Sequence, residues 1–104
     1  MVYRMQYRDR YEFLASVAMR LASKCCVKPK YLKQLTTREL MAVHRIANRI
    51  VRLKGSSKYC TLCNVGPYHP RALYNHYWFG HRDEIISMIK KELGVQDTLN
   101  VDKG

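Results

Sequence analysis

The chain has 104 residues and carries 19 Lys and Arg residues against 8 Asp and Glu residues, for a formal net charge of +11. This length suits one small domain, and the apolar content of 47% can supply its core. No apolar run approaches the ~20 residues that a membrane-spanning helix requires, and no signal peptide is recognised. We therefore expect an intracellular protein, of the cytoplasm or nucleus, and the charge favours a polyanionic partner, nucleic acid above all.

The first part of the chain, residues 1–54, is predicted to be a basic helical region. It contains 13 Lys and Arg residues but only three acidic ones, which gives it a local net charge of +10. Asp9 and Glu12 resemble a capping box, which predicts a helix over about residues 9–27. Apolar side chains recur along this segment at helical spacing, so we expect one side of the helix to be buried.

A second helix is predicted over about residues 37–53. Thr36 and Glu39 form another capping-box pattern at its start, and Gly55 ends it. One face of this helix is apolar. A second face carries four arginines. Because arginine forms bidentate contacts with phosphate, we predict that this face contacts nucleic acid; the alternative is that it is only a solvated surface. We call this second face the arginine face; it consists of Arg38, Arg45, Arg49 and Arg52.

The order and spacing of cysteines and histidines is the most informative motif in the chain. Cys60, Cys63, His76 and His81 follow the pattern C-x2-C-x12-H-x4-H. Thiolate sulfur and imidazole nitrogen are ligands that zinc accepts, so we predict one bound zinc ion. Four protein ligands leave no position for water or substrate, and we therefore expect a structural ion and no enzyme. His69 is an alternative ligand in place of either histidine.

Residues 58–81 resemble the Cys2His2 zinc finger family, over about a quarter of the chain. The resemblance implies a β-hairpin followed by a helix that carries both histidines. Leu73 stands where family members carry a core leucine, whereas the position of the family's core aromatic is occupied by Pro67. We therefore expect an irregular hairpin within a finger region over residues 55–81.

In this family the helix that leads into the histidines enters the major groove of DNA. By position, the resemblance makes His69, Ala72 and Asn75 the candidate contact residues, with Arg71 beside them. Asn75 could read adenine, and Arg71 could reach guanine or phosphate. Lys58 adds a further positive charge to the same region and is predicted to contact nucleic acid.

The last segment, residues 82–104, is predicted to contain a C-terminal helix followed by a polar, frayed tail. Its isoleucines recur at helical spacing, and Gly94 is expected to end the helix. The helix either continues the zinc-binding helix through a bend at Gly80 or packs as a separate element. Cys25 and Cys26, near the end of the first helix, are expected to be buried free thiols because adjacent cysteines rarely pair.

Together these patterns predict a mainly α, small α+β protein that forms one compact domain. It combines a helical N-terminal pair, one embedded ββα-like Cys2His2 finger and a C-terminal helix. We expect a zinc-containing nucleic-acid-binding protein, specifically a small DNA-binding transcription regulator, of a kind that a virus or mobile element can encode. The alternatives are a structural zinc-finger subunit of an RNA–protein particle such as a ribosome, and a protein-binding adaptor or inhibitor. A protein partner or a second copy of the chain is a further candidate partner.

Overall fold

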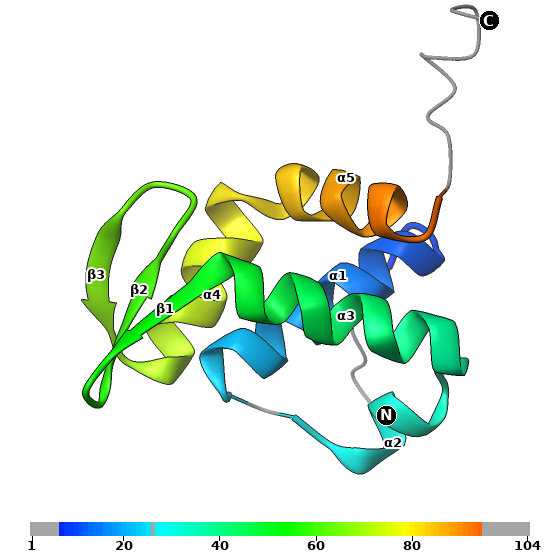
Figure 1. Ribbon diagram of the computed structural model, residues 1–104, viewed down its shortest axis with the longest axis horizontal. Helices are drawn as coiled ribbons and strands as arrows, with labels where there is room; N and C mark the ends of the chain where they lie inside the picture. The colour runs from blue at the N-terminus through cyan, green and yellow to red at the C-terminus, as the bar shows by residue number, and fades with distance from the viewer. Residues whose placement is uncertain (1–6, 26, 95–104) are drawn as a thin grey trace, which may run out of the picture.

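The computed structural model describes residues 7–25 and 27–94, so Cys26 and the polar tail lie outside the described residues. Within them the chain forms five helices and a small antiparallel sheet (Figure 1). This confirms the predicted small α+β class. In chain order the elements are α1 (Arg10–Ser23), α2 (Pro29–Lys33), α3 (Thr37–Ile50), β1 (Val51–Lys54), β2 (Ser57–Cys60), β3 (Val65–Tyr68), α4 (Pro70–Gly80) and α5 (Arg82–Glu92).

Helix α1 lies at the centre of the molecule and packs against α3, α4 and α5. In Figure 1, α3 crosses the front, α5 runs above it and the sheet lies at the left-hand end. Most of the side chains that fill the space between these helices are aliphatic, and Tyr74 and Tyr77 are buried among them. The largest of the fully buried side chains are Leu14, Val17, Met19, Val43, Ile46, Ile50, Leu73, Tyr77, Ile85 and Ile89.

Both predicted helix starts are present. The side chain of Asp9 accepts a hydrogen bond from the backbone N–H of Glu12 at 3.0 Å. Thr36 and Glu39 form both halves of a capping box, each side chain accepting a hydrogen bond from the other residue's backbone N–H. At its other end α1 stops at Ser23, earlier than predicted, because Lys24 takes a left-handed conformation with φ of 59°.

The second predicted helix also ends earlier than its periodicity suggested. α3 stops at Ile50, and Val51–Lys54 form β1 instead of a last helical turn. β1 pairs with β2 through a turn at Gly55, whose φ is +66°. Pairing with a strand that lies later in the chain therefore overrides the local helical pattern. As a consequence Arg52 belongs to the sheet rather than to the helix.

The sheet has the order β1-β2-β3, with one strand more than the predicted finger hairpin. The register between β2 and β3 shifts between Lys58 and Cys60, which confirms the expected irregularity. At this bend Gly66 lies directly against Tyr59, and a Cβ added to it would stand 2.7 Å from the Cδ2 atom of Tyr59. A side chain at this position would therefore force the two strands apart.

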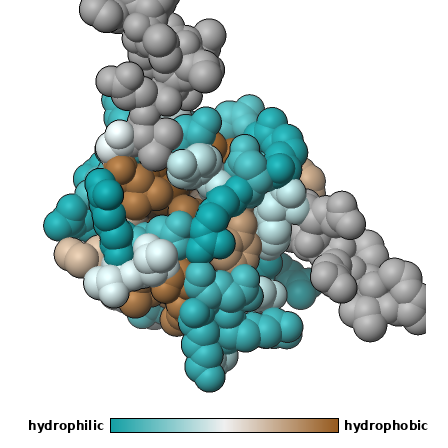
Figure 2. Space-filling view, turned by 90° about the vertical axis from the view of Figure 1, so that its right-hand side faces the viewer, coloured by the Kyte–Doolittle hydropathy of each residue, from teal (hydrophilic) through white to brown (hydrophobic). Residues whose placement is uncertain are grey.

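The C-terminal helix is a separate element, because the chain bends at His81 between α4 and α5. Seen from the right-hand side of Figure 1, hydrophilic side chains cover most of the surface, with hydrophobic ones visible between them (Figure 2). In the part of the chain that the structure describes, no helix has both the length and the apolar character required to cross a bilayer.

Candidate functional site

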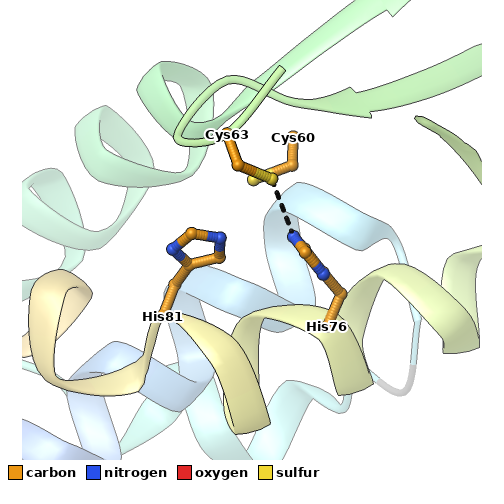
Figure 3. Close-up of side chains that lie close together, drawn as sticks. All are labelled: Cys60, Cys63, His76 and His81. Atoms are coloured by element: carbon orange, nitrogen blue, oxygen red, sulfur yellow. Dashed lines mark hydrogen bonds between the residues drawn. The ribbon is translucent and has the colours of Figure 1, made fainter. Parts of the chain in front are cut away.

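The four residues of the Cys2His2 motif come together at one end of α4 (Figure 3). Cys60 ends β2, and Cys63 lies in the turn that follows it. His76 lies within α4, and His81 occupies the bend between α4 and α5. One ligand atom from each residue lies within 4.8 Å of the other three, so the fold collects the predicted ligand set in a single cluster.

The dimensions of this cluster suit a metal ion. Tetrahedral coordination with Zn–S bonds of ~2.3 Å and Zn–N bonds of ~2.0 Å places neighbouring ligand atoms roughly 3.3–3.8 Å apart. The Sγ atom of Cys63 lies 3.3 Å from Nε2 of His76, and the wider separations reach 4.8 Å at most. A small adjustment of side chains would therefore complete a tetrahedral site, and the cluster can bind a metal ion.

The two cysteines converge because the backbone turns tightly after β2. Asn64 adopts a left-handed conformation with φ of 58°, and its N–H donates to the carbonyl of Cys60 at 2.8 Å. Burial raises the pKa of the Cys60 thiol, while the backbone N–H groups of Leu62 and Cys63 point at its sulfur and oppose that rise. Such N–H groups stabilise a thiolate, which is the form that binds metal.

Each histidine is oriented by a second side chain. The Nδ1 atom of His76 lies 3.3 Å from the hydroxyl oxygen of Tyr68, and the two rings stack with centroids 4.8 Å apart. The Nδ1 atom of His81 lies 2.9 Å from a carboxylate oxygen of Glu84. These contacts leave Nε2 of both rings for a metal. Burial, together with the nearby His81 ring, lowers the pKa of His76 and so favours the neutral imidazole that metals require.

Tyr68 and Glu84 were not among the predicted site residues. Glu84 follows His81 by three residues at the start of a helix, a spacing that places two side chains on one helical face. That spacing was a usable signal. Tyr68 is the last residue of β3, and it reaches His76 across the turn between β3 and α4. His69 takes the N-cap position of α4 and lies outside the ligand cluster.

Behind the ligands, α4 is anchored to the rest of the fold by buried side chains. Leu73 is fully buried, in agreement with the core position that the zinc-finger resemblance implied. Tyr77 is also fully buried, and its hydroxyl donates to the backbone carbonyl of Ile50 at 2.6 Å. The same carbonyl accepts a hydrogen bond from the N–H of Thr61 at 3.0 Å. The junction of α3 and β1 is therefore tied both to α4 and to the cysteine turn.

The predicted arginine face is divided between two elements, because only three of its members lie on α3. Arg38 donates to the backbone carbonyl of Leu93 at 3.0 Å. Arg45 lies 2.7 Å and Arg49 3.6 Å from the carboxylate of Glu92, near the end of α5. The fourth member is Arg52 on β1, which stacks over the ring of Tyr59.

This arrangement adds an acidic partner that sequence periodicity could not reveal. The helix pattern contains no acid among the arginines, but α5 packs against α3 and brings Glu92 to them. The side chain of Glu92 is only 16% exposed, whereas those of Arg45 and Arg49 are 61% and 58% exposed. Each guanidinium has five N–H donors, so both arginines keep outward-facing donors while Glu92 holds them in place.

The remaining predicted contact residues lie on β2 and α4, the elements that also carry Cys60 and His76. Lys58 is a half-buried residue of β2 and pairs with Tyr68 across the sheet. Arg71 and Asn75 are exposed one turn apart on α4, so they share its outward face. This face also carries Phe79, which is 82% exposed. Lys58 therefore lies on the sheet, apart from the α4 surface that Arg71 and Asn75 share.

Comparison with known proteins identifies no family for this chain. No protein-family model, no curated protein and no solved structure matches it. The four converging ligands are compatible with a Cys2His2-type zinc site. That cluster and the distribution of charge are the two observations that bear on function.

Proposed function

We propose that Cys60, Cys63, His76 and His81 hold one structural zinc ion. Two thiolates and two imidazole nitrogens form a donor set that suits zinc in tetrahedral geometry. Four protein ligands would fill the coordination shell and leave no position for a substrate. Because the ligands come from the end of β2, the following turn, α4 and the start of α5, the ion would fasten the sheet to both helices.

Metal content and metal dependence test this proposal directly. Purified protein should contain about one zinc ion per chain, and a chelator should unfold at least the sheet and α4, because the binding energy of a structural zinc is folding energy. Cys63→Ser should have the same effect as the chelator. Cys25→Ser removes a thiol outside the cluster and should leave the zinc content unchanged. A metal-free protein that keeps its helicity and its cooperative melt would refute the structural role.

We infer further that the protein binds nucleic acid, with duplex DNA as the partner. The observation that supports this inference is the distribution of acidic residues. No Asp or Glu occurs between Glu39 and Asp83, a segment that forms most of α3, the whole sheet and α4. A phosphate backbone is attracted to such a surface. The same segment contributes the basic residues Arg45, Arg49, Arg52, Lys54, Lys58, Arg71 and Arg82.

A small transcription regulator is the role that best combines a zinc-stabilised fold with this surface. Affinity for duplex DNA should fall as salt rises, with a slope that increases by ~0.9 for each phosphate contact. Arg45→Ala combined with Arg49→Ala should reduce that slope. Both arginines pair with Glu92, so the double variant should be made together with Glu92→Gln, and Glu92→Gln alone is the matched control. An unchanged slope would show that this part of the arginine face is only solvated.

The same titration separates the alternative functions. It should include duplex DNA, single-stranded DNA and structured RNA at each salt concentration. Preferential binding to structured RNA would favour a subunit of an RNA–protein particle. Weak, salt-independent contact with every nucleic acid, together with tight binding to one protein, would favour an adaptor.

A further inference from the structure

The exposed face of α3 carries a second row of side chains beside the arginines. At ~100° per residue, Met41, His44 and Asn48 fall within an arc of about 60°. All three side chains are exposed, and Met41 is 53% exposed. The opposite side of the helix is the buried one, so these side chains point away from the core. We call Met41, His44 and Asn48 the outer row of α3.

The polar side chains of the outer row have no partner among the described residues. Within the described residues, neither the side chain of His44 nor that of Asn48 forms a hydrogen bond or ion pair. In contrast, the neighbouring arginines are held by Glu92 and by the carbonyl of Leu93. One edge of the exposed face therefore consists of positioned cations, and its centre consists of unengaged side chains.

The shape of α3 suits insertion into a groove. The helix has 14 residues, which corresponds to a length of ~21 Å at 1.5 Å per residue. It crosses the front of the molecule in Figure 1, with α1 behind it. The major groove of B-DNA, about 12 Å wide and 8.5 Å deep, admits a helix of this kind. Cations along one edge of an inserted helix would lie beside the phosphates that border the groove.

The side chains of the outer row can contact the edges of bases. Asn presents a donor and an acceptor side by side and can bind adenine at N6 and N7. His44 lies one turn before Asn48 and offers ring nitrogens as donor or acceptor. Met41 offers an apolar surface of the kind that contacts the thymine methyl group. The only acidic residue of α3, Glu39, lies in the first turn and is neutralised by Arg10.

We propose that α3 is the helix that enters the major groove. This proposal rests on the proposed binding to duplex DNA. Asn48 and His44 read base edges there, and Arg45 and Arg49 contact the adjoining phosphates. The finger helix α4 then serves mainly to hold the sheet and the zinc site in place. This assignment differs from the expectation that the zinc-finger resemblance carries, in which Asn75 on α4 contacts bases.

Selection of binding sites from random duplexes, with the full-length zinc-loaded protein, tests the assignment. Asn48→Ala is the central variant, and Asn75→Ala is the matched control because it removes the same exposed amide from α4. Asn48→Ala should lose discrimination by roughly 5- to 150-fold at one adenine position. Its affinity for unselected duplex should stay within about twofold of the parent, because base contacts add little to nonspecific binding.

The possible outcomes separate this inference from the proposed function. Loss of preference in Asn48→Ala but not in Asn75→Ala supports reading by α3. Loss only in Asn75→Ala overturns it in favour of the finger helix. A parent protein that binds duplex DNA with a salt-dependent affinity but selects no sequence also overturns it, while leaving the proposed function intact. No binding to duplex DNA at low salt overturns both.

Discussion

Removal of the Tyr68 hydroxyl should weaken metal binding without disturbing the fold. The substitution Tyr68→Phe deletes the oxygen that lies 3.3 Å from Nδ1 of His76 but keeps the ring that stacks on the imidazole. Loss of such an outer partner typically costs 10- to 100-fold in metal affinity. The contact is long and only partly buried, so water can replace part of it. We therefore expect a loss of about tenfold in metal affinity.

Competition with a chelator of known affinity at fixed neutral pH measures this effect. Tyr59→Phe is the matched control, because Tyr59 lies on the neighbouring strand and its ring contacts Arg52 rather than a ligand. Glu84→Gln should cost less than Tyr68→Phe, since the Glu84 side chain is 53% exposed and solvent can take its place beside His81. Equal affinities for the Tyr68→Phe protein and the parent, or an equal loss in Tyr59→Phe, would show that the hydroxyl does not orient His76.

Two further predictions concern stability. Tyr77→Phe should lower the free energy of unfolding by about 1 kcal/mol in urea denaturation of the metal-bound protein, because it removes one hydrogen bond to the Ile50 carbonyl. The loss should be no larger, because this carbonyl keeps its hydrogen bond from the N–H of Thr61. A loss above ~3 kcal/mol would mean that the carbonyl is left unsatisfied. The hydrogen bond from Arg10 lowers the pKa of Glu39 from 4.5 to about 2. The stabilisation of the folded protein by ionised Glu39 is therefore complete above pH 4.5 and declines as the pH falls toward 2. Glu39→Gln should therefore destabilise the protein at neutral pH by ~1 kcal/mol and should approach the stability of the parent in acid; a difference that is independent of pH would contradict this account.

Local chemistry explains the features that were predicted correctly from the sequence. The helix starts at Asp9 and Thr36 were predictable because an N-cap side chain and the backbone N–H that donates to it lie only three residues apart. The clustering of the four cysteine and histidine residues was predictable because the donor atoms that zinc accepts are few and their spacing is restricted. The spacing of cysteines and histidines therefore identified all four members of the cluster before any geometry was known.

Features that depend on pairing or packing between different elements were decided only by the tertiary structure. Val51–Lys54 became a strand because β2 was available to pair with it, although the segment continues a helical pattern. Tyr68 reached His76 through the packing of β3 against α4. Glu92 reached Arg45 from 47 residues away. In each case the deciding contact joins two different elements, and the periodicity of one element does not encode its contacts with another.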